Sequence, residues 1–255
     1  MSKLQKRYYK LIYKYIYNIM NSNKFDNIKP LVKEEKISWP YKTLPQPPFR
    51  LIVVAPSNVG KSCMVSNLIS SDNFPYKKYF GENIFIFSPT FKMGSMEGMT
   101  NIKKNNVFDT FDTEVLNSII REQKDLVELY GKKKSSPILI VLDDVVGELD
   151  ARRKDFLKKS YFGLRHFNGS IILLAQQYKA IPKPVRMNCS ESIFFEVANN
   201  NELKDICDEQ NLEQERFLNI YEYATQVQPY SFLCVRYKNP KKTRYQLRFT
   251  TQYLN

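Results

Sequence analysis

The chain lacks any long apolar run. None of its 255 residues belong to an apolar stretch approaching the length of a bilayer span, and the N-terminus has no short apolar core typical of a signal peptide. We therefore expect neither a transmembrane segment nor a secretory leader. The four cysteines, Cys63, Cys189, Cys207 and Cys234, lie far apart without a CxxC pair. This pattern argues against a zinc site and indicates reduced thiols in a cytosolic or nuclear setting.

Acidic residues are also scarce relative to basic ones. The chain has 26 Asp and Glu against 39 Lys and Arg, a formal net charge of +13. Such an excess favours a polyanionic partner, with nucleic acid first and an anionic membrane surface second. The alternative is a lysine-rich surface produced by an AT-biased genome. Hydrophobic residues at 43% and charged residues at 25% are ordinary for a globular protein with one large core.

Patterning divides the chain into three predicted parts. Residues 1–44 form a basic N-terminal arm and linker, 45–200 a central core, and 201–255 a C-terminal part packed on that core. Residues 3–20 carry apolar side chains with a 3.6-residue period and basic side chains opposite, which predicts a basic amphipathic helix. Its apolar face would dock on the protein's own core or a neighbouring subunit, or the helix would contact nucleic acid or a membrane.

Strands alternate with helices from Phe49 onward, which predicts an α/β fold with a mostly parallel sheet flanked by helices. The expected strands span 49–54, 84–88, 138–142, 171–175 and 192–197. The expected helices span 60–70, 113–130, 151–160 and 201–222, the last broken near Gln210-Asn211. Two further alternating stretches, 231–237 and 245–250, predict a hairpin with a basic tip over 238–244.

The segment Ala55-x-x-x-x-Gly60-Lys61-Ser62 lies between a buried strand and a helix, the setting of a phosphate-binding P-loop. Lys61 would reach the β- and γ-phosphates of ATP, and the Ser62 hydroxyl would hold Mg²⁺. Ala55 stands where glycine is usual, and we expect a slightly stiffer loop. The predicted nucleotide-binding residues are Ala55, Pro56, Ser57, Asn58, Val59, Gly60, Lys61, Ser62 and Cys63.

Two acids follow the apolar strand at 138–142 and predict the second half of an ATP site. Asp143 would act on Mg²⁺, and Asp144 would activate the attacking water, with Glu148 as a substitute. The simpler alternative is that both acids cap the next helix. An apolar strand at 84–88 precedes them in sequence. Together these motifs favour the inserted-strand branch of P-loop NTPases, the ASCE or RecA-like type.

Two more residues flank the strand at 171–175. Gln176 follows it, where an amide can sense the γ-phosphate and the attacking water. Arg165 precedes it, so we expect Arg165 to lie at the opposite end and to act as an arginine finger on an adjacent subunit. An ordinary surface arginine is the alternative.

The succession of these motifs resembles a known family. Ala55–Ser62, Ile138–Asp144, Arg165-His166, Gln176-x-Tyr178, Ile181-Pro182 and Arg186-x-Asn188 are similar to the FtsK–HerA superfamily, within it to poxvirus-like DNA-packaging ATPases of large DNA viruses and virophages. The resemblance covers about residues 49–200. It implies a homo-oligomeric ring, a pentamer or hexamer, that hydrolyses ATP with Mg²⁺ and drives double-stranded DNA into a preformed capsid. It also implies capsid or portal-vertex partners and a place in the host cytoplasm, at the virus factory, in the nucleus or in the virion.

Two other functions share parts of this pattern. A single-stranded nucleic-acid helicase would have the same ATP site and basic surface. A scaffold with a degenerate P-loop would bind nucleotide without hydrolysing it, although the presence of Lys61, Ser62 and Asp143 argues against it. For DNA contacts we expect phosphate-binding side chains at Lys179, Lys183, Arg186 and the 238–244 hairpin.

Overall fold

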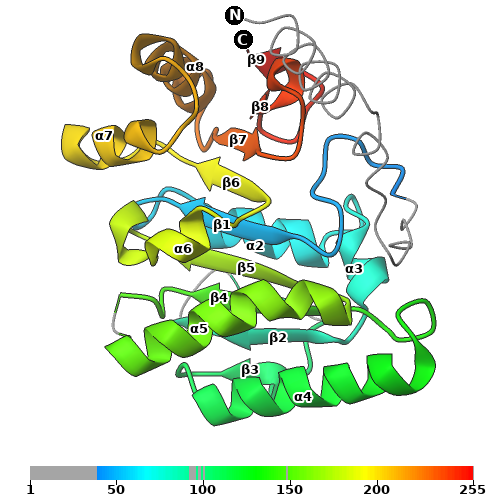
Figure 1. Ribbon diagram of the computed structural model, residues 1–255. Coiled ribbons are helices and arrows are strands. Elements are labelled where there is room, and N and C mark those ends of the chain that lie inside the picture. The colour runs from blue at the N-terminus through cyan, green and yellow to red at the C-terminus, as the bar shows by residue number, and fades with distance from the viewer. Residues whose placement is uncertain (1–38, 92–95, 97–98, 100, 148, 255) are drawn as a thin grey trace, which may run out of the picture. The chain divides into compact units, whose positions relative to one another are not determined.

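A mixed β-sheet with helices on both faces confirms the predicted α/β fold (Figure 1). The computed structural model describes residues 39–254, apart from 92–95, 97–98, 100 and 148. The helix predicted over 3–20 lies outside the described residues, as does Glu148.

The parallel part of the sheet contains the predicted core strands. In the described residues the strands are β1 (Arg50–Val54), β2 (Ile84–Phe87), β3 (Val107–Phe108), β4 (Ile138–Asp143), β5 (Gly169–Ala175), β6 (Glu191–Phe194), β7 (Leu233–Arg236), β8 (Tyr245–Leu247) and β9 (Tyr253–Leu254). Their order is β3-β2-β4-β5-β1-β6-β7-β8-β9. Neighbours from β3 to β6 pair in parallel, and those from β6 to β9 pair antiparallel. The strand inserted in space between β1 and β4 is therefore β5, and β2 lies beyond β4.

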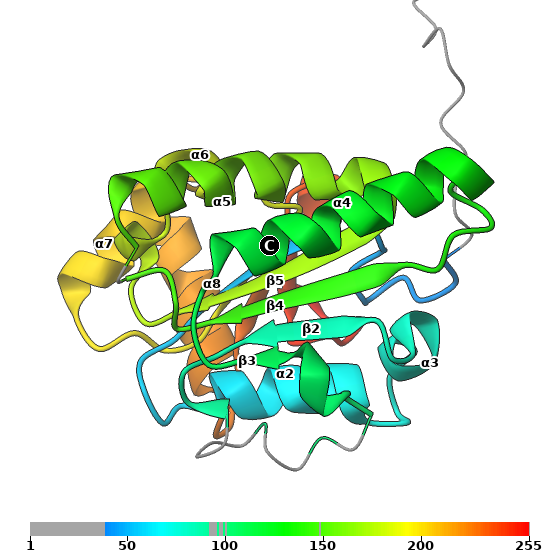
Figure 2. The ribbon, with the colours of Figure 1, turned by 90° about the horizontal axis from the view of Figure 1, so that it is seen from below.

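Helices cover the two faces unequally. The α-helices are α2 (Lys61–Ser70), α3 (Tyr76–Phe80), α4 (Thr113–Tyr130), α5 (Ala151–Gly163), α6 (Lys183–Arg186), α7 (Asn200–Asp208) and α8 (Gln214–Gln226), and the 3₁₀ turns are η2 (Lys104–Asn106), η3 (Leu164–Phe167), η4 (Tyr178–Ala180) and η5 (Lys241–Thr243). Figure 2 shows α2 and α3 on one face of the sheet and α4 and α5 on the other. Side chains of α7 and α8 pack in the same core as those of α4 and α5.

Alternation along β1 explains the two layers. Leu51 and Val53 pack in the core under α2 and α3, whereas Ile52 and Val54 pack in the core under α4 and α5. All four side chains are fully buried. A central strand covered on both faces reads as a continuous apolar run, which is what the sequence shows.

The structure also corrects several predicted boundaries. The predicted break near residue 210 is confirmed, because α7 ends at Asp208 and α8 begins at Gln214. The strand predicted over 192–197 ends at Phe194, where its pairing with β7 stops. The short elements α3, β3, α6 and β9 were not predicted. The domain boundaries at 44/45 and 200/201 stay predictions, although strands on both sides of residue 200 share the sheet. No helix in the described part of the chain is long and apolar enough to span a bilayer.

Candidate functional site

The predicted P-loop connects the end of β1 to the start of α2. Asn58, with φ 65°, and Gly60, with φ 93°, adopt left-handed backbone conformations. The ring of Tyr230 lies close to this glycine, because a Cβ at position 60 would be 3.2 Å from Cδ1 of Tyr230. Among the described residues, no side chain caps the start of α2. The first amides of this ten-residue helix are therefore suited to binding an anion.

Ala55 fits the first loop position without backbone strain. Its N–H donates to the carbonyl of Ala175 at 3.1 Å and continues the pairing of β1 with β5. Its methyl group is fully buried, and its φ is not positive. This position therefore does not require glycine, which explains how the chain accommodates the departure from the usual motif.

Lys61, Asp144 and Gln176 converge from three different elements. The Nζ atom of Lys61, on the first turn of α2, lies 2.7 Å from Oδ2 of Asp144, just after β4. The Nε2 atom of Gln176, just after β5, donates to the same oxygen at 3.2 Å. Lys61 is 6% exposed, so its ammonium group is largely withdrawn from solvent. The carboxyl ends of adjacent parallel strands meet at one edge of the sheet, which is why residues so distant in sequence meet here.

Asp143 is the last residue of β4 and is buried. Its Oδ2 accepts a hydrogen bond from the Ser88 hydroxyl at 2.9 Å. Its Oδ1 has no hydrogen-bond partner among the described residues. Burial raises the pKa of Asp143, and the neighbouring Asp144 carboxylate acts in the same direction, against the Ser88 hydrogen bond and the charge of Lys61. A buried carboxylate oxygen without a partner is suited to a hard cation such as Mg²⁺.

Ser88 was not predicted from the sequence, although its position gave a signal. It directly follows β2, a buried parallel strand, and so lies at the same sheet edge as Asp143. Its hydroxyl lies 3.4 Å from that of Thr90. The polar Ser-Pro-Thr segment after an apolar strand is typical of a site residue at the carboxyl end of a parallel sheet.

A cavity of about 1090 Å³ opens beside the P-loop. The predicted residues in its lining are Ser57, Asn58, Gly60, Lys61, Ser62, Cys63 and Asp144. Ala55 and Val59 pack in the core instead, and Pro56, Asp143 and Gln176 are not part of the lining. Its far wall comes from the C-terminal part of the chain: Phe195, Tyr230, Phe232, Arg248, Phe249 and Thr250. No sequence pattern linked these residues to the P-loop.

Arg165 lies away from this cluster. It is an exposed residue of η3, which precedes the amino end of β5, whereas Gln176 directly follows the carboxyl end of β5. The seven residues of β5 separate the two ends of the strand by about 20 Å. Burial lowers the pKa of Arg50, the first residue of β1, and the charge of Arg165 contributes to that shift. Arg165 is therefore close to the amino end of β1, at the sheet edge opposite the P-loop.

Arg186 is not available to DNA, so its predicted phosphate contact is wrong. Its guanidinium is buried and donates from Nε and Nη2 to the Glu209 carboxylate at 3.0 and 2.5 Å. It also donates to the Ile181 carbonyl and stacks on the Tyr178 ring at 4.8 Å. Lys179 is exposed but lies 2.5 Å from Asp205, and Lys183 is exposed. Arg186 therefore ties η4 and α6 to the end of α7.

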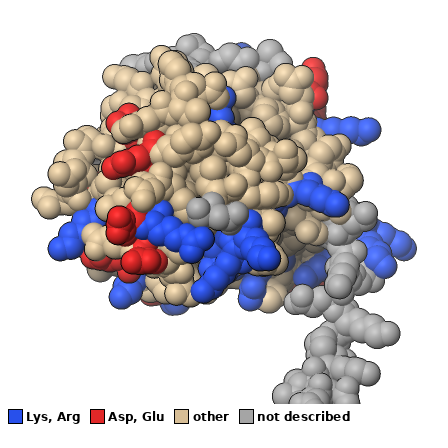
Figure 3. Space-filling model, turned by 90° about the horizontal axis from the view of Figure 1, so that it is seen from above, with Lys and Arg blue, Asp and Glu red and all other residues tan. Residues whose placement is uncertain are grey.

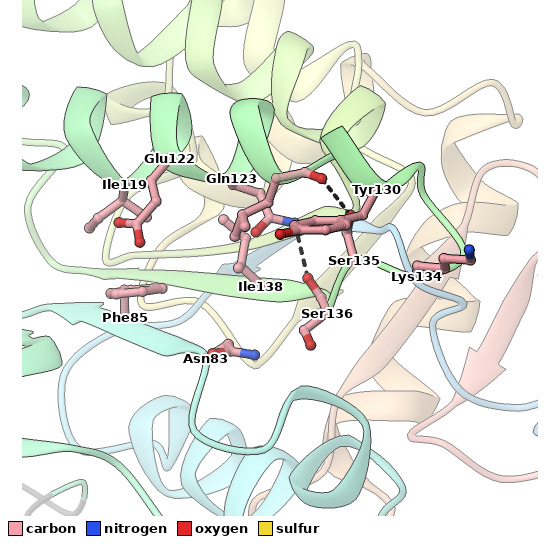
Figure 4. Close-up of a pocket in the computed structure, with 11 residues that line it drawn as sticks. Asn83, Phe85, Ile119, Glu122, Gln123, Tyr130, Lys134, Ser135, Ser136 and Ile138 are labelled. Carbon is pink, nitrogen blue, oxygen red and sulfur yellow. Dashed lines mark hydrogen bonds between the residues drawn. The ribbon is translucent and has the colours of Figure 1, made fainter. Parts of the chain in front are cut away.

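A second cavity, of about 340 Å³, lies near the amino ends of β2 and β4 (Figure 4). Tyr130 and Ile119 of α4 line it together with Asn83 and Ser136. The side-chain amide of Gln123 donates to the carbonyls of Ser136 and Phe167. Both carbonyl groups therefore already have a hydrogen-bond partner within the chain. None of the predicted site residues lies in its lining. The chemistry predicted from the sequence belongs to the P-loop cavity.

Sequence comparisons match the part of the chain that contains this site. A model of the family described as "Poxvirus A32 protein" matches residues 36–228. The DNA packaging protein OPG160 of Monkeypox virus is 30% identical over 156 residues, which make up 59% of this chain and 49% of that protein. The protein of the same name from Vaccinia virus (strain Copenhagen) is 28% identical over 154 residues, 59% of this chain and 54% of that protein. The chain thus matches about half the length of these relatives.

Structure comparisons show the same fold. The genome packaging NTPase B204 from Sulfolobus turreted icosahedral virus 2 in complex with sulfate aligns with a TM-score of 0.51 and 16% identity, over 76% of this chain and 93% of that one. The same protein in complex with AMPPCP aligns with a TM-score of 0.50 and 15% identity, over 75% and 93% of the two chains. At this identity the likeness establishes the fold alone.

Proposed function

The chain belongs to the poxvirus A32 protein family, and from this premise we propose that it is an ATP-hydrolysing motor that moves double-stranded DNA during viral genome packaging. The predicted resemblance to poxvirus-like packaging ATPases is thereby confirmed at the level of the family. Relatives of this chain are named DNA packaging proteins, and a protein of the same fold is a packaging NTPase. These names support the proposal for this chain.

One observation carries the proposal. Lys61 and Gln176 both donate hydrogen bonds to the Oδ2 atom of Asp144, beside the P-loop. A surface turn has no need for a buried lysine paired with an acid 83 residues away. ATP hydrolysis needs both, because a cation must bind the terminal phosphates and a base must receive the proton of the attacking water. Gln176 is close enough to Asp144 to orient the same water.

The oxygen donors around Asp143 suit Mg²⁺. Asp143 and Ser62 would hold the ion, Asp143 through the oxygen that has no partner among the described residues. When bound, Mg²⁺ neutralises phosphate charge as it develops. The residues of the chain would do the rest: Lys61 leaves Asp144 and binds the β- and γ-phosphates, and Asp144 then accepts the proton from water. Glu148, the alternative base, lies outside the described residues.

The remaining parts of the motor concern partners. Figure 3 shows Lys and Arg side chains gathered along one side of the face it views, with Asp and Glu among them. The whole chain has a net charge of +13, and this surface supports binding to DNA phosphates without base recognition. Lys183 and the hairpin between β7 and β8 are the contacts we propose. Arg165 lies at the sheet edge opposite its own P-loop, which supports a homo-oligomeric ring in which it reaches a neighbour.

A pentameric or hexameric ring, a capsid or portal-vertex partner, and a location in the host cytoplasm, nucleus or virion are further parts of this proposal. They rest on the family alone.

ATP hydrolysis measured with and without long duplex DNA, at two salt concentrations, tests the proposed function. We expect duplex DNA to stimulate hydrolysis, and the stimulation to fall steeply at the higher salt concentration because phosphate contacts release counterions. Stimulation by single-stranded but not duplex DNA would favour a helicase. Nucleotide binding without any turnover would instead indicate a non-enzymatic scaffold.

A further inference from the structure

The P-loop cavity continues well beyond the space that phosphates need. It extends along the side of α2, past Cys63, Met64 and Asn67, to the C-terminal segments 230–232 and 248–250. We call this extension the aromatic trough. The trough lies on the β6–β7–β8 side of β1, whereas Asp144 and Gln176 lie on the β4–β5 side. A single ligand could therefore place one end in the aromatic trough and a chemically different end near Asp144 and Gln176, on the other side of β1.

The walls of the trough are aromatic. The ring of Phe249 packs against those of Phe232, at 5.2 Å, and Phe74, at 6.3 Å. The Arg248 guanidinium lies 6.0 Å from the Phe232 ring, and the Arg248 N–H donates to the Phe232 carbonyl at 3.1 Å. Tyr230 is 68% exposed, although its ring packs directly on the P-loop backbone at Gly60. The largely exposed Tyr230 side chain and the Arg248 guanidinium are suited to stacking on a flat, π-bonded ligand.

The spacing of the strands fits a nucleotide. β7 is two strands away from β1 in the sheet, a separation of about 10 Å at the sheet edge. Phosphates bound at the start of α2 would place the rest of a nucleotide in the trough, because the terminal phosphate would lie toward Asp144 and Gln176, on the other side of β1. Asn67, whose amide donates to the Cys63 carbonyl at 2.8 Å, adds a polar group on the α2 side.

We propose that the aromatic trough binds the purine base of the nucleotide, with Tyr230 and Arg248 as its principal contacts. This inference rests on the proposed function, because it takes the phosphates to be bound by the P-loop. A purine presents a larger stacking surface than a pyrimidine, so the trough favours ATP over UTP. The segments that precede β7 and follow β8 then contribute to nucleotide selection, which the P-loop motif by itself does not provide.

Affinities of the full chain for ATP, UTP and inorganic tripolyphosphate, each with Mg²⁺, test the trough. We expect Tyr230→Ala and Arg248→Gln each to weaken ATP binding about tenfold, the order expected when one stacking partner is removed. Tripolyphosphate binding should not change in either variant, because it has no base. Tyr230→Phe should retain ATP affinity, and the preference for ATP over UTP should shrink in Tyr230→Ala. Tyr130→Ala, an exposed tyrosine at the other sheet edge, is the matched control.

The other outcomes separate this inference from the proposed function. If both variants bind ATP as the unaltered chain does, the base subsite is overturned and the P-loop assignment stands. If ATP and tripolyphosphate weaken equally, Tyr230 and Arg248 only shape the P-loop, and the base subsite is again overturned. If the unaltered chain binds neither ATP nor tripolyphosphate, the proposed function is overturned and the base subsite with it.

Discussion

Lys61 and Asp144 form an ion pair with a separation of 2.7 Å between Nζ and Oδ2. In ATP hydrolysis the two residues would have different partners. Lys61 would bind the terminal phosphates, and Asp144 would accept a proton from the attacking water. The two charges satisfy each other in a largely buried site. In the proposed mechanism nucleotide binding separates them, so the pair would couple phosphate binding to release of the base.

Asp144→Asn should therefore bind ATP at least as tightly as the unaltered chain while losing hydrolysis. The amide cannot accept a proton, so turnover should fall by about 10²–10⁴-fold. Lys61 no longer has to leave a carboxylate, which removes an opposing contribution to ATP affinity. Calorimetric ATP binding and steady-state phosphate release measure the two effects. Near-normal turnover in this variant would assign the base to another residue, Glu148 first.

The left-handed backbone at Asp144, with φ 53°, makes asparagine the appropriate substitution. Asparagine tolerates this conformation better than alanine, so the variant separates chemistry from backbone strain. Asp155→Asn, on the exposed surface of α5, is the control, because its carboxylate pairs with surface lysines. It should bind and hydrolyse ATP normally.

Asp143→Asn should make the nucleotide-free protein more stable and less active. Burial raises the pKa of Asp143, so ionising it in the folded chain is unfavourable. A raised carboxyl pKa contributes stability at low pH that is lost as the pH rises through the folded-state pKa. The variant does not undergo this loss. Its melting temperature should exceed that of the unaltered chain at pH 7, and the difference should shrink as the pH falls toward the acidic range.

Thermal unfolding without metal or nucleotide, over a series of pH values, measures this difference. The Ser88 hydroxyl can still donate to the asparagine carbonyl, so the packing of β2 against β4 is kept. A melting temperature lower than that of the unaltered chain at neutral pH would mean that the Asp143 charge is compensated in the folded protein. ATP hydrolysis should be lost in the same variant, because a ligand of Mg²⁺ is removed.

The sequence was sufficient to predict the phosphate and acid motifs because each is continuous and ends a buried strand. Strand pairing then brings Lys61 to Asp144 without further information. The aromatic trough could not be predicted in this way, because Tyr230 and Arg248 are about 170 residues or more from the P-loop, in segments of ordinary composition. Arg186 was misassigned for a related reason. Its burial depends on Glu209, a partner from another helix end that no local pattern identifies.

Arg186→Ala should destabilise the fold by about 3 kcal/mol, because it leaves a largely buried carboxylate without its cation. Burial acts to raise the pKa of Glu209, but hydrogen bonds from Arg186 and Tyr178 hold that pKa below its usual value. A lowered carboxyl pKa contributes stability that is lost as the pH falls through it. Urea unfolding at pH 7 and at acidic pH should show the destabilisation at pH 7 and less of it in acid. Lys183→Ala, exposed and nearby, should have a much smaller effect, because the Lys183 charge acts on Glu209 without a hydrogen bond.

The basic hairpin should contribute to DNA affinity through charge alone. Lys241 and Lys242 are exposed in η5, between β7 and β8. Replacing both with alanine should reduce the magnitude of the log–log salt slope for duplex DNA by about 1.8, or about 0.9 for each phosphate that is no longer neutralised. Fluorescence anisotropy over a salt series measures the slope. The control is a double variant on α3, Lys77→Ala with Lys78→Ala, which lowers the net charge by the same amount. An equal change in the salt slope of this control would show that the hairpin has no special role.

Arg165 should act across a subunit boundary. It lies at the amino end of β5, and its own P-loop cluster lies at the carboxyl end about 20 Å away. Its side chain is exposed beside the positive charge of Arg50, so a negatively charged group of a neighbour would be favoured there. Arg165→Ala should bind ATP normally and hydrolyse it about 10³–10⁵-fold more slowly. Arg152→Ala, an exposed arginine on α5, should hydrolyse ATP at the normal rate.

Mixing Arg165→Ala with Lys61→Ala subunits distinguishes a finger from a surface arginine. Lys61→Ala lacks the ammonium group that would bind the terminal phosphates but keeps Arg165. Arg165→Ala keeps an intact P-loop. A mixed assembly therefore contains some boundaries where an intact Lys61 faces an intact Arg165, and ATP hydrolysis should partly recover there. Subunits with two different affinity tags, purified through both, establish that the mixture has co-assembled. If such doubly purified assemblies hydrolyse ATP no faster than either variant alone, Arg165 does not complete a neighbour's site.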